Sequence, residues 1–130
     1  MSIEPIATPS QPWAAGPYSP AVRAGDWIIC SGQVGIDPAS GNIVMGGIEP
    51  QARQALANMT AVLADAGATW ADVAKVTLFV GTGSPQYMEE VNAVYTEVVG
   101  DHHPARSTIG VAWLPLGAVF EVEVWAYRPA

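Results

Sequence analysis

Residues 50–80 of this chain read PQARQALANMTAVLADAGATWADVAKVTLFV, and they predict a helix followed by a strand. In the first half, apolar side chains recur every three or four residues, which lines one face of an α-helix. These apolar positions are Ala52, Ala55, Leu56, Met59, Val62, Leu63 and Ala66. Gly67 follows them where glycine commonly ends a helix. Residues 73–80 are rich in β-branched and aromatic types, which is typical of a central strand. The stretch therefore predicts a helix packed on a sheet.

Upstream of this stretch, the sequence predicts a loop and then a hairpin. Residues 8–20 contain four prolines and a glycine, and proline both removes a backbone donor and blocks a helix. Residues 21–24 and 27–34 are two largely apolar runs joined by Gly25 and Asp26, which form a turn signal. Turn residues at 37–42 and the pair Gly46-Gly47 then lead into the helix.

Downstream, the sequence predicts a second helix and two further strands. Ser84 is a candidate N-cap, with Pro85 at the first helical position and Gly100 at the end. The expected apolar stripe of this helix consists of Tyr87, Val91, Val94, Tyr95 and Val98. Residues 106–113 and 119–127 read as extended runs joined through residues 114–117. The order ββ-α-β-α-ββ predicts an α+β fold, a mixed sheet with two helices on one face.

Length and composition narrow the class of protein. The 130 residues suggest one domain spanning 1–130, and 50% apolar against 13% charged side chains argues against disorder. The formal net charge of −7 repels phosphate backbones and anionic membranes, so we expect neither nucleic acid nor a membrane as a partner. Because so few charges must cover the surface, and one sheet face lacks helices, we expect an oligomer.

The cysteine count and the N-terminus bear on location. Cys30 is the single cysteine, so no disulfide can form within the chain, and a reducing compartment fits best. The first residues carry neither a basic segment nor an apolar one, and the sequence has no run of eighteen apolar residues. We therefore expect a cytoplasmic protein.

The sequence contains none of the motifs that indicate a nucleotide, dinucleotide or zinc-protease site. His102 and His103 are adjacent, and neighbouring residues rarely converge on one metal, so a solvated loop is favoured over a metal site. No metal site is predicted.

Arg106 is the most informative basic residue, because it begins an apolar strand in a chain with four arginines and one lysine. One interpretation is a structural ion pair with an internal carboxylate. The other is a bidentate clamp for the carboxylate of a substrate, a geometry that guanidinium suits better than ammonium.

A few other polar residues are candidates for a site. Glu121 and Glu123 are two residues apart in an extended run, so their side chains share one sheet face. They could form the solvent-facing side of an edge strand, or one carboxylate could orient a water molecule or transfer a proton. Ser31-Gly32 reads as a turn or as a place where a ligand approaches the backbone. Tyr18 could wall a pocket or cap the core, and Asn92 is unusual inside a helix unless it reaches a backbone group.

Taken together, these residues resemble the RidA/YjgF family of reactive intermediate (imine/enamine) deaminases, and the matching segments follow one another in the family's order. The matching segments cover nearly the whole chain. They are GPYSP at 16–20, ICSGQ at 29–33, QARQALAN at 51–58, VNAVY at 91–95, PARS at 104–107, LP at 114–115 and VFEVE at 119–123.

The resemblance implies a chorismate-mutase-like (RidA-like) subunit in a homotrimer, with active sites between subunits and neither metal nor organic cofactor. It assigns the substrate carboxylate to Arg106 and water placement to Glu121. It places Tyr18, Ser31, Gly32, Asn92 and Thr108 around the substrate. The implied reaction converts small 2-imino or 2-enamino acids, such as 2-iminopropanoate and 2-iminobutanoate, to 2-keto acids and ammonia.

Two departures from the family pattern keep alternatives open. Thr108 stands where these deaminases commonly have cysteine, and threonine cannot supply a thiolate. Val34-Gly35-Ile36 replaces a segment where proline is common, which changes the rim of the pocket. The alternatives are a deaminase of a larger enamine, of the aminoacrylate or aminomuconate type, and a trimer that binds a small carboxylate without turnover. A chorismate-mutase-like isomerase and a nuclease are both disfavoured, the first because fold does not carry function and the second by the charge.

Overall fold

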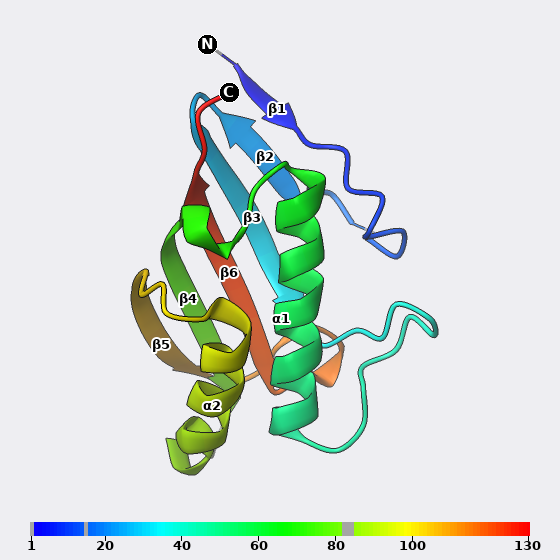
Figure 1. Ribbon diagram of the computed structural model, residues 1–130. Coiled ribbons are helices and arrows are strands. Elements are labelled where there is room, and N and C mark those ends of the chain that lie inside the picture. The colour runs from blue at the N-terminus through cyan, green and yellow to red at the C-terminus, as the bar shows by residue number, and fades with distance from the viewer. Residues whose placement is uncertain (1, 15, 82–84) are drawn as a thin grey trace.

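The computed structural model describes residues 2–14, 16–81 and 85–130, and in these residues six strands form one mixed sheet. The spatial order is β1-β2-β3-β6-β4-β5, and the two helices cover the same face of the sheet (Figure 1). The strands are β1 (Ile3–Pro5), β2 (Ala21–Ala24), β3 (Trp27–Val34), β4 (Val73–Gly81), β5 (Ala105–Val111) and β6 (Phe120–Tyr127), and the helices are α1 (Ile48–Asp65) and α2 (Met88–Val99). The predicted α+β architecture is confirmed.

The topology follows from the connections between strands. β2 and β3 form the predicted antiparallel hairpin, and Gly25 adopts φ 63° in its turn, a conformation that glycine reaches without strain. β4 and β5 run parallel because α2 carries the chain back between them. β6 then inserts between β3 and β4, antiparallel to both.

The position of β6 corrects one interpretation of the two glutamates. Glu121 and Glu123 do share a face, because the residues between and beside them are buried under the helices. The strand that carries them is central and not an edge strand, so the solvent side of an edge strand cannot explain them.

Helix α1 forms because its apolar stripe covers the sheet. It begins at Ile48, two residues before the predicted start, and ends at Asp65, with Gly67 at φ 79° just beyond. The main core consists of the buried faces of both helices and of the central strands. Its largest fully buried side chains include Phe120, Ile28, Leu56, Met59, Leu63 and Leu78.

Helix α2 begins later than predicted. A short 3-10 turn, η2 (Pro85–Tyr87), precedes it, so Pro85 starts that turn instead of the α-helix. The proposed cap, Ser84, lies outside the described residues. Tyr87 was wrongly assigned to the apolar stripe, since it is 40% exposed. Val91, Val94 and Tyr95 are buried as expected, and the helix ends at Val99, followed by Gly100 with φ 76°.

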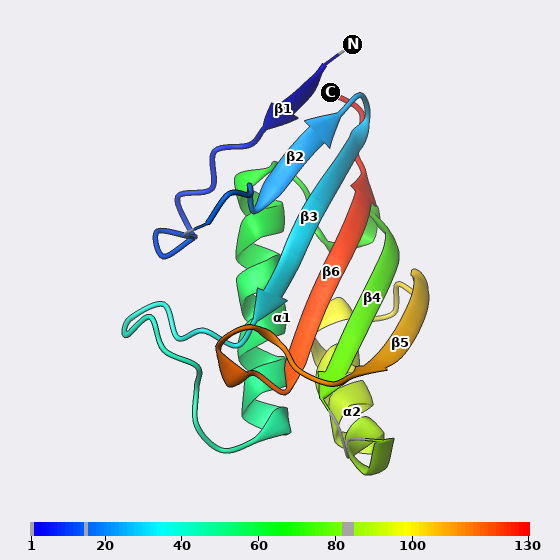
Figure 2. The same ribbon diagram turned by 180° about the vertical axis from the view of Figure 1, so that it is seen from behind.

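The sheet face opposite the helices, which faces the viewer in Figure 2, carries aromatic side chains that are exposed. Trp27 of β3 packs edge-on against Trp125 and Tyr127 of β6, with ring centroids 6.2 Å and 5.2 Å away. We call these three residues the aromatic cluster.

None of the helices described by the structure has the length and apolar character that a membrane crossing requires.

Candidate active site

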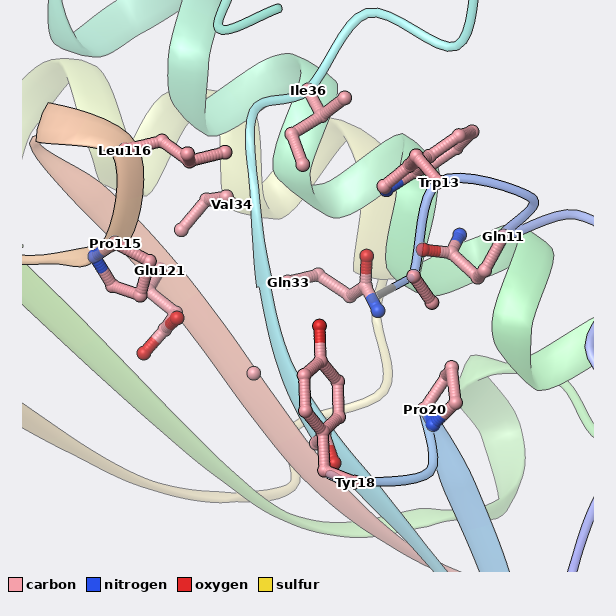
Figure 3. Close-up of a pocket in the computed structure, with 13 residues that line it drawn as sticks. Gln11, Trp13, Tyr18, Pro20, Gln33, Val34, Ile36, Pro115, Leu116 and Glu121 are labelled. Carbon is pink, nitrogen blue, oxygen red and sulfur yellow. The ribbon is translucent and has the colours of Figure 1, made fainter. Parts of the chain in front are cut away.

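A cavity of about 480 Å³ lies where β3, β6 and the N-terminal loop meet (Figure 3). We call it the Glu121 cavity. It contains four of the residues that the sequence singled out, namely Tyr18, Ser31, Gly32 and Glu121. Its remaining walls come from the loop before β2, from the end of β3 and from the turn before β6.

Glu121 reaches across the backbone of Gly32. A Cβ atom placed on Gly32 would lie 2.6 Å from the Cδ atom of Glu121, closer than real Cβ contacts. Burial, followed by the negative charge of Glu123, raises the pKa of the Glu121 carboxyl. A half-buried carboxyl with a raised pKa keeps its proton to a higher pH than an exposed one, which suits a group that exchanges a proton with a bound water.

Ser31 fixes the loop that carries Tyr18. Its hydroxyl donates a hydrogen bond to the carbonyl of Ser19, 2.6 Å away, and its backbone N–H donates to the carbonyl of Pro20. β3 has a register shift between Cys30 and Gln33, so Ser31 and Gly32 lie in an irregular part of the strand. Tyr18 is 57% exposed and lines the cavity, with its hydroxyl pointing toward Gln33 (Figure 3).

A second cavity, of about 270 Å³, lies between α2 and the beginning of β5, and we call it the Arg106 cavity. The guanidinium carbon of Arg106 lies 4.8 Å from the centroid of the Tyr95 ring, a cation–π contact. Among the described residues, Arg106 forms no salt bridge. The described residues therefore offer no carboxylate partner for a structural ion pair with Arg106, and its guanidinium group is available to an anion.

The two cavities lie on opposite faces of the sheet. Arg106 is aligned with Val76 of β4, whose side chain is buried beneath the helices. Glu121 alternates along β6 with Phe120 and Val122, which are buried on that same helix side, so Glu121 points to the open face. Within one chain, the structure thus separates Arg106 from Glu121.

The remaining predicted residues fall beside Arg106. Asn92 lines the Arg106 cavity with an exposed side chain, instead of turning to a backbone group as the sequence suggested. Its carbonyl accepts a hydrogen bond from the Thr96 hydroxyl, at 2.9 Å. Thr108 is exposed on β5 and, two residues after Arg106, shares its sheet face.

Sequence reasoning missed two buried amide side chains of α1, one of which supports the Glu121 cavity. Asn58 is buried and donates to the carbonyls of Val34 and Ile36, at 3.1 Å and 2.9 Å, and both of those residues line the cavity. Gln51, also buried, accepts a hydrogen bond from the backbone N–H of Val119 at 2.8 Å. The signal was present, because both amides interrupt an otherwise apolar helix face.

The adjacent histidines separate in the structure. His102 Nε2 lies 2.7 Å from the carbonyl oxygen of Val73, whereas His103 lines the Arg106 cavity. Across residues 2–14, 16–81 and 85–130, no three His, Cys, Asp or Glu side chains are grouped so that they could hold a metal ion.

This fold and its two cavities define a small α+β protein in which one cavity contains Arg106 and the other contains Glu121. The chain belongs to the RidA/YjgF family, because residues 8–128 match the family model described as endoribonuclease L-PSP.

Individual relatives agree with this assignment. The human 2-iminobutanoate/2-iminopropanoate deaminase is 40% identical over 123 residues, which is 95% of this chain and 88% of the human protein. A RutC family protein of Pyrococcus abyssi is 38% identical over 98% of this chain and 99% of its own. A Yersinia pestis structure from the conserved Rid family superimposes with a TM-score of 0.89 at 39% identity, covering 97% of this chain and 99% of that one.

Proposed function

We propose that this protein hydrolyses small 2-imino acids and their 2-enamino tautomers to 2-keto acids and ammonia. Water adds to the imine carbon, and the carbon–nitrogen bond of the resulting tetrahedral adduct breaks. The water oxygen becomes the keto oxygen, and the nitrogen leaves with the protons that complete ammonia. The uncatalysed reaction already proceeds in water, so positioning and proton transfer are sufficient roles for the protein.

One observation carries the proposal: Arg106 is held over Tyr95 at the edge of a cavity and has no carboxylate partner among the described residues. A guanidinium group pairs with a carboxylate through two parallel hydrogen bonds, which fixes the orientation of the bound acid as well as its position. Arg106 would hold the substrate carboxylate, with Asn92 and Thr108 beside it.

Glu121 would place the attacking water and carry its proton. Because Arg106 and Glu121 point from opposite sheet faces of one chain, a site that uses both requires residues of two chains. We therefore propose a homotrimer whose active sites lie between subunits, each combining the Arg106 cavity of one copy with the Glu121 cavity of the next. The exposed aromatic cluster supports burial of the open sheet face in such an assembly.

Thr108 supplies neither a thiolate nor any other nucleophile in this scheme. At this exposed position on β5, threonine can act through its backbone and its shape. A reaction that needs no covalent intermediate tolerates this substitution for the common cysteine.

The remaining features of the proposal follow the sequence expectations. Residues 1–130 would act as a single RidA-like domain in the cytoplasm, with a small carboxylate-bearing substrate and no cofactor. An endoribonuclease activity, which the family description names, is disfavoured because a net charge of −7 with five basic residues repels RNA.

The test measures keto-acid formation from freshly generated 2-iminopropanoate and 2-iminobutanoate, against the uncatalysed background. We expect the wild type to accelerate both, and Arg106→Ala to lose at least about 100-fold in kcat/KM, since an unpaired substrate charge is costly. Arg128→Ala is the matched control, because that exposed arginine lies outside both cavities.

Two results would redirect the proposal. If the wild type leaves both small imines at the background rate but hydrolyses a larger enamine, the deaminase of a larger enamine is the correct alternative. If it hydrolyses neither but binds a small carboxylate through Arg106, the non-catalytic trimer is correct.

A further inference from the structure

The Arg106 cavity holds a second basic side chain, that of His103. Within one chain, six of the described residues line the cavity, and none of the six is an aspartate or a glutamate: Asn92, Tyr95, Thr96, His103, Pro104 and Arg106. In a chain with twelve acidic and five basic residues, a cavity lined by an arginine and a histidine without a carboxylate is a distinct electrostatic feature. The cavity therefore attracts an anion.

Basic side chains elsewhere in the described part of the chain are already engaged. Arg53 pairs with Glu49 and Glu97, Arg128 pairs with Asp72, Lys75 donates to the Ser107 hydroxyl, and Arg23 donates to the carbonyls of Gly25 and Arg128. Arg106 and His103 are thus the basic groups that remain available to an anionic ligand in one place.

The cavity has more hydrogen-bond donors than one carboxylate requires. A bidentate pair with Arg106 occupies both oxygens of a carboxylate in the plane of the guanidinium. His103 offers at least one N–H in either protonation state, and the amide of Asn92 offers two more. The Thr96 hydroxyl is already used, since it donates to the Asn92 carbonyl. His103 and Asn92 line the same cavity as Arg106, so their donors are available to a second acidic group of a bound acid.

We propose that His103 binds a second carboxylate on the substrate side chain, so that the preferred substrates are 2-imino dicarboxylates of four or five carbons. This inference rests on the proposed function and names its substrate class. A cavity of about 270 Å³ accommodates an acid of that size. His103 is then a specificity-determining residue, whereas Arg106 binds the carboxylate next to the imine in every substrate.

His102 provides an internal control for this assignment. It has the same side chain one position earlier, but its Nε2 atom faces the carbonyl of Val73 at the start of β4, and it does not line the cavity. An effect of His103 that His102 does not share cannot come from a general change in charge.

The experiment compares kcat/KM for 2-iminosuccinate and 2-iminopropanoate, both generated in the assay by oxidation of the parent amino acids. We expect the wild type to favour the dicarboxylate, and His103→Ala to lower the ratio about tenfold or more, as loss of a hydrogen bond to a charged group does. His103→Lys should restore most of the ratio, and His102→Ala should leave it unchanged.

A second measurement needs no variant. Succinate should inhibit the wild type at concentrations about tenfold or more below those needed for propanoate, because it can engage both basic groups. Equal inhibition by the two acids, or an equal loss of activity toward both imines in His103→Ala, would overturn the proposal. Failure of the wild type to accelerate either imine would instead overturn the proposed function.

Discussion

The carboxyl group of Glu121 occupies the space in which any side chain on Gly32 would have to begin, with 2.6 Å between the Cδ atom and an added Cβ. The sequence suggested that Gly32 lets a ligand approach the backbone. The structure shows that the absence of a side chain on Gly32 also leaves room for the Glu121 carboxyl in the wall of the same cavity. The two residues come from neighbouring strands, β3 and β6, so the sheet itself determines where the carboxyl lies.

Gly32→Ala is expected to displace Glu121 and to lower kcat by about 10- to 100-fold, in the range of general acid–base contributions. The Tm should fall by only a few degrees, about the effect of 1 kcal/mol. Gly110→Ala is the matched control, because an added Cβ there meets nothing within 4 Å. If imine hydrolysis is unchanged in Gly32→Ala, the position of Glu121 does not matter for the reaction.

Glu121→Gln is expected to stabilise the fold at neutral pH. Because burial raises the pKa of this carboxyl in the folded state, the unfolded state loses its proton first as the pH rises. The protonated carboxyl therefore contributes its full stability at pH values below the pKa of Glu121 in the unfolded state. This contribution is lost as the pH rises through the pKa of Glu121 in the folded state.

Thermal unfolding of wild type and Glu121→Gln at several pH values measures this effect. The gap in Tm should be present at pH 7 and should close below about pH 4, where the carboxyl is protonated in both states. Glu4→Gln, at an exposed glutamate of β1, is the control. A gap that widens toward low pH would contradict the assignment.

Asn58→Ala is expected to destabilise the protein by about 2–4 kcal/mol, since it leaves the carbonyls of Val34 and Ile36 without their buried donor. Urea titration gives the free energy of unfolding. Gln54→Ala removes the neighbouring bond to Asn58 Oδ1 and should cost about 1 kcal/mol or less. Equal losses in both variants would show that Asn58 acts through α1 and not through the cavity wall.

The fold was predictable because its signals are local and agree with one another. The stripe of α1, the hairpin turn at Gly25 and the terminal Gly67 each have a short-range physical cause. The place of β6 in the sheet was not predictable, because strand order depends on which long-range pairs bury the most apolar surface. The interpretation of Glu121 on an edge strand failed for that reason.

The candidate site was predictable as a set of residues but not as an arrangement. Strand alternation put Glu121 on the same face as Glu123, and residue type together with the family resemblance selected both Arg106 and Glu121. Their separation across the sheet depends on the register between β5, β4 and β6, which no local pattern reveals. The role of Gly32 as the neighbour of Glu121 depends on the same register.

Tyr95→Phe is expected to preserve stability or to raise it by up to about 1 kcal/mol. The Tyr95 hydroxyl is buried and has no hydrogen-bond partner among the described residues, so its removal relieves a desolvation cost. The ring beneath Arg106 remains. Chemical denaturation gives the stability, and a loss above 1 kcal/mol would reveal a partner for the hydroxyl, such as a bound water. Tyr87→Phe, at an exposed tyrosine, should change little.

Cys30 is expected to resist alkylation in the folded protein. Burial raises the pKa of its thiol to about 12, so the reactive thiolate is scarce at neutral pH. The rate of labelling by iodoacetamide, followed by mass spectrometry, should match the rate of unfolding. Rapid labelling under native conditions would show that the core around β3 opens locally.

The aromatic cluster gives the protein an intrinsic optical reporter of its own association. Trp27 and Trp125 are 37% and 44% exposed on the open sheet face, whereas Trp70 is buried in the core. Assembly through that face would move two of the five indole rings from water into protein. Dilution of the protein would then shift tryptophan emission toward longer wavelengths as subunits part, so fluorescence can follow the subunit equilibrium without an added dye.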